Sequence, residues 1–281
     1  VHAGEVVLYL DLALPTAPEA RSIYRAVGDG RRFTIDPLDP VVTDARAPSA
    51  IIAGDLVYLY FEQAGEIRVA SATDGIAFAA PVTALAGPAS APSAVVVEGE
   101  VALYHVRGDA IGLATGAPGE RLVDRGVVLP PGDAQVGDPL DPTAAFWNPI
   151  TQLASPHATL AGPQGPTSAG ASIRLWFAGF GQESPPGSKF GQPEPIPPNY
   201  SIGFAAAEPG DPSTLAVWPY GPIADRVEVF LSHHDELGPA GVTVGGDRWF
   251  LYFVDATHTA PAGALGPFEL GRLQVLGSGS R

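Results

Sequence analysis

The feature that most constrains this fold is a unit of short strand-forming runs that the chain repeats. Residues 46–85 hold four such runs, rich in β-branched and aromatic residues and separated by turns that contain Gly or Asp. No run is long enough for an ordinary helix, so the segment predicts a four-stranded antiparallel meander. The first run surrounds Pro48, and the second contains Tyr60.

The same unit recurs along the chain. Related first runs surround Pro92, Pro156 and Pro239, and an N-terminal copy occupies residues 4–42. The spacing between the prolines grows along the chain, which predicts longer loops in the later copies. Five four-stranded units predict an all-β chain that folds as a five-bladed β-propeller, in which neighbouring sheets bury each other's apolar faces.

We expect a single domain over residues 1–281. Its blades are expected at about residues 1–44, 45–87, 88–132, 150–224 and 236–277. Position 1 is Val rather than Met, and the innermost strand of the first blade projects upstream of it, so we expect a processed or trimmed chain. The last blade ends near Leu276 after three strands. Either a strand upstream of Val1 completes this blade, or the blade has three strands.

Charge and composition narrow the class of partner. The 281 residues carry 30 acidic and 15 basic side chains, a formal net charge of −15, with no polybasic run. Nucleic acids and anionic membrane surfaces attract cationic proteins, so neither is an expected partner. No apolar run approaches about 18 residues, so no membrane span is expected. Cysteine is absent, which excludes disulfides and thiolate chemistry.

The composition also carries an expectation about location and assembly. The chain has 34 Gly and 30 Pro residues and only one lysine, Lys189. This bias is typical of a high-GC bacterial source, and a signal peptide removed upstream fits the first residue. We therefore expect a secreted, periplasmic or cell-surface bacterial protein that is a monomer.

The repeats resemble those of glycoside hydrolase family 43 and its relatives over nearly the whole chain. The likeness rests on the proline of each first strand, the Gly54-Asp55 hairpin, the tyrosine-rich second strand and Pro156-His157. It implies a propeller glycosidase that uses three carboxylates at the starts of innermost strands. These would be a base in blade one, a tuning residue in blade three and an acid in blade four.

Two of the three implied catalytic positions do not carry a carboxylate, and the third lies outside the given sequence. The blade-one position lies upstream of Val1, while Ala91 stands at the tuning position and Ala154 at the acid position. Because alanine neither donates nor accepts a proton, the resemblance implies a carbohydrate-binding or catalytically degenerate propeller. One alternative is an active hydrolase with relocated carboxylates, with Asp235 and Glu236 as candidates. The other is a protein-interaction scaffold.

Oligo- or polysaccharide is the expected partner, and five residues are candidates to bind it. They are Arg46, Ser93, Trp147, His157 and His233. Arg46 stands where the family resemblance has a tryptophan, and Trp147 lies in a loop from which it could stack on a sugar ring. Trp176 is better explained as a core residue.

A metal site is a further hypothesis, and no other cofactor is indicated. His157 matches a family position near the axis, and His234 belongs to the polar cluster 233–236, so these two histidines are candidate ligands. The ion would be an axial one such as calcium. The alternatives are a hydrogen-bonded core histidine at 157 and a solvated loop at 233–236.

Overall fold

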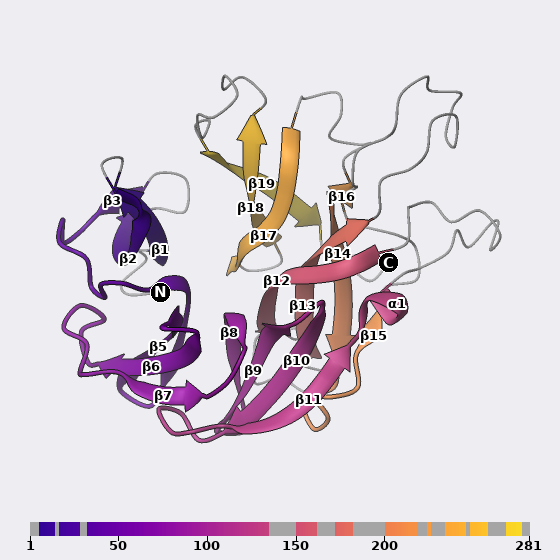
Figure 1. The fold of residues 1–281 in the computed structure, drawn as a ribbon, viewed down its shortest axis with the longest axis horizontal. Coiled ribbons are helices and arrows are strands. Elements are labelled where there is room, and N and C mark those ends of the chain that lie inside the picture. Colours follow the sequence, from indigo (N-terminus) through magenta and orange to yellow (C-terminus); the bar gives the residue numbers. More distant parts are fainter. Residues whose placement is uncertain are drawn as a thin grey trace. The chain divides into compact units, whose positions relative to one another are not determined.

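The computed structural model describes ten segments of the chain (Figure 1). They are residues 6–14, 17–28, 33–134, 150–161, 172–181, 200–217, 224–225, 234–245, 248–257 and 268–276. Contacts divide the chain into two compact units, each described here by itself. The first comprises residues 1–108 and 112–126, and the second comprises residues 109–111 and 127–281.

The described elements are strands, apart from the single-turn helix α1 (Pro131–Ala134). The all-β class and the antiparallel meander sheets predicted from the repeats are therefore confirmed. Five sheets are seen in the described residues, and whether they form five blades about one axis stays a prediction. None of the described residues forms a helix long and apolar enough to cross a membrane.

The first three sheets run in chain order, each strand pairing with the next. The first sheet contains β1 (Val6–Leu14), β2 (Ala17–Gly28) and β3 (Phe33–Ile35). The second contains β4 (Arg46–Ala53), β5 (Leu56–Gln63), β6 (Glu66–Ala72) and β7 (Val82–Leu85). The third contains β8 (Ser90–Val97), β9 (Glu100–Arg107), β10 (Ala110–Gly116) and β11 (Val123–Leu129).

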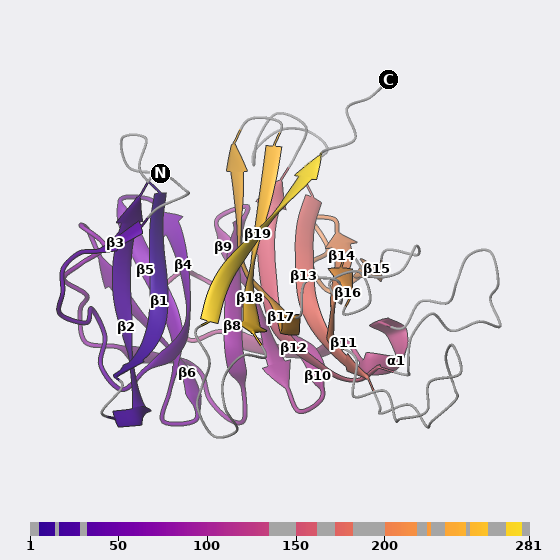
Figure 2. The ribbon, with the colours of Figure 1, turned by 90° about the horizontal axis from the view of Figure 1, so that it is seen from above.

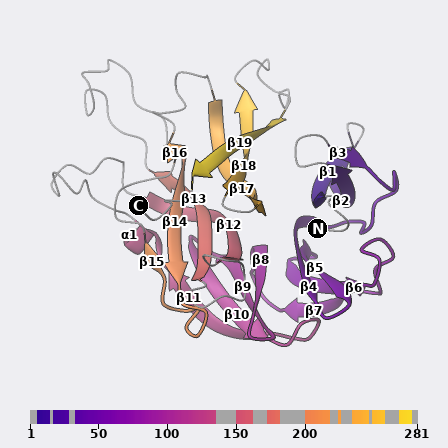
Figure 3. The same ribbon diagram turned by 180° about the vertical axis from the view of Figure 1, so that it is seen from behind.

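The two remaining sheets belong to the second unit, and Figure 3 shows their strands side by side. One contains β12 (Ile150–Ala161), β13 (Ser172–Gly181), β14 (Tyr200–Ala207), β15 (Ala216–Val217) and β16 (Ala224–Asp225). The other contains β17 (His234–Gly245), β18 (Arg248–Thr257) and β19 (Phe268–Leu276).

Two outer strands are shorter than the sequence predicts. The prediction places strands over residues 34–42 and 78–85, whereas β3 ends at Ile35 and β7 begins at Val82. Pro37 and Pro40 have no backbone N–H to donate to a ladder, so the pairing with β2 is interrupted there and returns only as an isolated bridge between Ile23 and Val42. At the other strand, the Asp74 carboxylate accepts hydrogen bonds from the N–H groups of Ile76 and Ala77, which fixes a turn instead.

The first strands of three sheets share one irregularity. Their register shifts over residues 46–49, 90–93 and 154–157, where each strand has one residue more than its partner. The residue before the proline of each is left-handed: Ala47, Ala91 and Ser155, with φ of +49°, +46° and +46°. This is a β-bulge, a device that bends a strand and redirects its side chains. The proline that the sequence repeats therefore marks a repeated bulge.

Within the first unit, two apolar clusters join adjacent sheets, and Figure 2 shows β1 and β2 beside β4 and β5. The first cluster is centred on Ile23, Leu59 and Phe61, which are fully buried. At its edge the Tyr9 ring packs edge-on against Phe78 with centroids 5.9 Å apart, and its hydroxyl donates to the carbonyl of Gly75.

The second cluster packs β4–β7 against β8–β11 through Tyr60, Ile67 and Leu103. The Ala94 N–H donates across to Ser49 Oγ at 3.0 Å, so the first strands of these two sheets are neighbours near their bulges.

In the second unit, the buried apolar side chains that the structure describes come from β12, β13 and β14. Leu153, Leu175 and Phe177 are almost fully buried there. Trp176, which the sequence analysis interprets as a core residue, is only 3% exposed and stacks at a tilt on Phe204.

Candidate functional site

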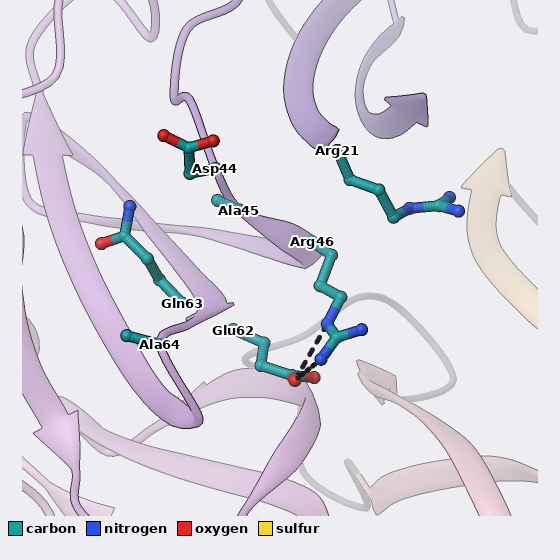
Figure 4. A pocket seen from close by; sticks show the side chains of 7 residues that line it. All are labelled: Arg21, Asp44, Ala45, Arg46, Glu62, Gln63 and Ala64. Carbon is teal, nitrogen blue, oxygen red and sulfur yellow. Dashed lines mark hydrogen bonds and ion pairs between the residues drawn. The ribbon is translucent and has the colours of Figure 1, made fainter. Parts of the chain in front are cut away.

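An open hollow lies where β4 begins and β5 ends, entirely within the first unit (Figure 4). Its volume is about 260 Å³. The wall comes from β2, from the start of β4 and its approach, and from the end of β5 and its turn. The lining residues are Arg21, Asp44, Ala45, Arg46, Glu62, Gln63 and Ala64.

Arg46 and Glu62 form the central feature of this hollow. They are register partners on β4 and β5, and both Nε and Nη2 of Arg46 donate to Oε1 of Glu62, at 2.9 and 2.6 Å. The Arg46 side chain is 59% exposed, whereas that of Glu62 is only 11% exposed. A carboxylate so far from water needs a charged partner, which Arg46 supplies. Among the described residues, neither Oε2 of Glu62 nor Nη1 of Arg46 has a hydrogen-bond partner.

Asp11 on β1 holds the backbone beside this pair. Its Oδ2 accepts a 2.8 Å hydrogen bond from the N–H of Ala47, the left-handed residue of the β4 bulge. Its Oδ1 accepts from Nη2 of Arg21, whose side chain forms another part of the wall. Asp11 therefore ties the first sheet to the bulge and fixes the position of the Arg46 backbone.

Sequence reasoning identified Arg46 and missed the residues around it. The predicted strand ends at Leu10, one residue before Asp11, and Glu62 follows an apolar run without a motif to mark it. A signal was present, because Tyr9 and Asp11 alternate onto one face of β1, and both contact the second sheet. The Arg46–Glu62 pairing follows only from the register of the bulged hairpin.

The equivalent positions of the other bulged strands are uncharged. Ser90 is opposite Val106 in the third sheet, and Ala154 is opposite Ala178 in the sheet of β12. The two alanines that the family resemblance aligns with catalytic carboxylates, Ala91 and Ala154, thus lie at or beside equivalent bulges. Ala91 is the left-handed residue of its bulge, whereas Ala154 directly precedes its bulge, so the two stand one position apart in the plan of their sheets.

Ser93 lies directly after the bulge of β8, opposite Tyr104, and is 2% exposed. It is therefore buried at the start of the strand, beside the Ala94 N–H that reaches Ser49. Its role in binding a saccharide stays a prediction.

His157 lies in the corresponding place on β12, opposite Trp176, and is partly buried. Burial lowers the pKa of its imidazole from 6.5 to about 4. The ring is therefore neutral near pH 7, which is the form that can bind a metal and also the form that a core tolerates. Its role as a metal ligand stays a prediction.

The other predicted site residues lie partly or wholly outside what the structure describes. The backbone of His234, Asp235 and Glu236 belongs to β17, but their side chains lie outside what the structure describes. Trp147 and His233 lie outside the described residues altogether. In the part of the chain that is described, no group of three or more His, Cys, Asp or Glu side chains is placed to hold a metal ion.

His105 is a histidine that the sequence analysis did not single out. It stands opposite the bulge of β8, where the other two bulged hairpins carry Phe61 and Phe177, and it is 1% exposed. Burial lowers the pKa of its ring, and its Nε2 has no partner among the described residues. A Cβ on Gly112 would come within 2.7 Å of this ring, so the glycine makes room for it.

Comparison with known proteins supports the fold. No family model matches the chain, and no curated protein matches it. A glycosyl hydrolase from Bacteroides ovatus is similar in structure, with a TM-score of 0.58 and 12% identity over 95% of this chain and 84% of that one. A thermostable family-43 glycoside hydrolase is similar with a TM-score of 0.57 and 14% identity, over 97% of this chain and 86% of that one.

A third similar structure comes from work on the GH130 family of mannoside phosphorylases. That family contains glycoside hydrolases that target β-1,2-mannosidic linkages in Candida mannan. This structure gives a TM-score of 0.60 and 13% identity over 95% of this chain and 84% of that one. At such identities the likeness concerns the fold alone. The propeller class predicted from the repeats is confirmed, and this chain has the fold of propeller glycoside hydrolases.

Proposed function

We propose that this protein is a glycosidase-like propeller that binds an oligo- or polysaccharide and lacks the acid and tuning carboxylates of family 43. The observation that carries the proposal is the set of three bulged strand starts. At these starts stand Arg46 in β4, Ala91 in β8 and Ala154 in β12, and the resemblance aligns the two alanines with the tuning carboxylate and the acid. None of these side chains can act as the acid or as the residue that tunes it.

The remaining expectations belong to the same proposal. The chain is a secreted, periplasmic or cell-surface bacterial protein and acts as a monomer with five blades. Light scattering of the purified protein checks the oligomeric state directly. A ring of five blades is supported by the five sheets in the described residues.

The test combines hydrolysis and binding on the full 281-residue chain. Aryl arabinosides, xylosides and galactosides are offered as substrates, and arabinotriose and β-1,2-mannobiose are titrated by calorimetry. We expect no appreciable turnover, because loss of a general acid alone lowers rates by roughly 10²–10⁴-fold. We expect binding to at least one oligosaccharide, since hydrogen bonding and stacking need no proton transfer.

Two outcomes would replace the proposal by one of its alternatives. Robust hydrolysis that Asp235→Asn or Glu236→Gln abolishes would establish an active hydrolase with relocated carboxylates. Neither hydrolysis nor binding across a broad saccharide panel would favour a protein-interaction scaffold.

A further inference from the structure

We propose that the hollow beside Arg46 and Glu62 is a subsite for one uncharged sugar unit, held through two neighbouring hydroxyl groups. One hydroxyl donates to Oε2 of Glu62, and its neighbour accepts from Nη1 of Arg46, which has no partner among the described residues. This inference rests on the proposed carbohydrate-binding function, and it adds the place and the chemical class of the sugar.

The size of the hollow sets the extent of the ligand. Its volume is about 260 Å³, below the roughly 300–1,000 Å³ of pockets that enclose drug-sized ligands. It therefore takes one monosaccharide unit at the end or edge of a chain. None of the seven lining residues is aromatic, so recognition here depends on hydrogen bonds rather than on stacking.

The hydrogen-bonding capacity left by the ion pair matches a sugar. Arg46 uses Nε and Nη2 on a single oxygen of Glu62, so the pair keeps one carboxylate oxygen as acceptor and Nη1 as donor. A sugar hydroxyl donates one hydrogen bond and accepts others, and adjacent hydroxyls can present both functions side by side. Bonds to ionised partners are the stronger kind, which suits a shallow site with few contacts.

The charge balance selects an uncharged sugar over an acidic one. Arg46 is paired with Glu62, and Arg21 is paired with Asp11, so neither guanidinium carries an uncompensated charge. Asp44 adds a negative charge to the wall. The carboxylate of a uronic acid would have to displace one of these pairs and approach a chain of net charge −15. Neutral hydroxyls avoid both costs.

The site is also held in position before any ligand arrives. Asp11 fixes the N–H of Ala47 at the bulge, and Glu62 fixes the guanidinium of Arg46 from the neighbouring strand. Because fewer side chains need ordering on binding, a small contact area can still give measurable affinity.

Calorimetric titration of the full chain with neutral arabinotriose, neutral β-1,2-mannobiose and acidic galacturonotriose tests the inference. We expect Arg46→Ala and Glu62→Gln to raise Kd for the neutral ligand about tenfold or more. We expect galacturonotriose to bind at least about tenfold more weakly than the neutral ligand. Arg107→Ala is the matched control, because Arg107 pairs with Asp124 in the same unit with both side chains exposed. It should leave Kd unchanged.

The outcomes separate this inference from the proposed function. Wild-type affinity in both Arg46→Ala and Glu62→Gln would overturn the subsite and leave saccharide binding in place. Tighter binding of galacturonotriose than of the neutral sugars would overturn the uncharged class. No binding of any saccharide by the wild-type chain would overturn the proposed function together with the subsite. A cooperative unfolding transition well above the titration temperature in each variant shows that a lost affinity is local.

Discussion

The hairpins β4–β5 and β12–β13 share a backbone plan and differ in their side chains. Each begins with a bulge whose pre-proline residue is left-handed, Ala47 in one and Ser155 in the other. Before the bulge, β4 carries Arg46 paired with Glu62, whereas β12 carries Ala154 opposite Ala178.

Opposite each bulge stands a buried phenylalanine, Phe61 in β5 and Phe177 in β13. The bulge and the aromatic residue behind it therefore belong to the fold, since they recur in two hairpins whose polar residues differ. The residue directly before the bulge varies without disturbing that plan. This is where one sheet has a charged pair and the other has none.

The largest effect is expected from removing the shared aromatic support. Phe61→Ala and Phe177→Ala should each lower the free energy of unfolding by roughly 3–5 kcal/mol, because each empties a fully buried volume. Denaturant titration of both variants measures the loss in the free energy of unfolding. Leu38→Ala is the control, since Leu38 is 83% exposed and its loss should change stability by less than about 0.5 kcal/mol. A large loss in only one hairpin would mean that the two bulges are not supported alike.

Much of this plan could be predicted from the sequence. The repeated proline, the tyrosine-rich second strands and the Gly-Asp turns predicted the sheets and their order, because strand period and turn chemistry are local properties. The bulge itself was not predicted, because residues before proline ordinarily avoid left-handed backbone. The strand limits near Pro37 and Asp74 were missed, since they depend on which N–H groups find partners.

The second effect comes from His157, next to the bulge of β12, where β4 has Ser49. The folded-state pKa of about 4 lies below the ordinary 6.5, so protonation favours the unfolded chain. Stability is therefore complete above about pH 6.5 and is lost as the pH falls toward 4. The wild-type chain should lose roughly 1–2 kcal/mol more than His157→Asn between pH 7 and pH 5. Equal losses measured by denaturant titration at the two pH values would show that the imidazole remains hydrated.

The candidate site could be predicted only in part. Arg46 stood out because it replaces a tryptophan in a familiar motif, but Glu62 and Asp11 carry no local signal. Their roles arise from the register of β4 against β5 and from a contact between β1 and β4 that spans 36 positions of sequence. Pairings of this kind depend on tertiary structure, and neither strand period nor turn chemistry encodes them.

A smaller effect distinguishes the charged hairpin from an ordinary surface pair. Arg46→Ala should cost about 1–2 kcal/mol of stability, because it leaves the poorly exposed carboxylate of Glu62 without its partner. Arg107→Ala should cost less than about 1 kcal/mol, since both members of that pair are exposed. Thermal and denaturant unfolding measure both changes. Equal losses of stability in the two variants would indicate that water solvates the unpaired carboxylate of Glu62 as well as it solvates that of Asp124.

The smallest effect concerns the left-handed residues that both hairpins share. Ala47 and Ser155 have positive φ, which costs an L-residue roughly 1 kcal/mol or more and costs glycine little. Glycine also loses about 0.5–1 kcal/mol more chain entropy on folding. Ala47→Gly and Ser155→Gly should therefore be neutral or stabilising by up to about 0.5 kcal/mol.

The matched control is Ala50→Gly, three residues along β4 and outside the positive-φ set, which should cost about 0.5–1 kcal/mol. The hydrogen bond from residue 47 to Asp11 uses only the backbone N–H, so the glycine variant keeps it. If Ala47→Gly proved as costly as Ala50→Gly in denaturant titrations, the bulge would not be the strained device that the two hairpins have in common.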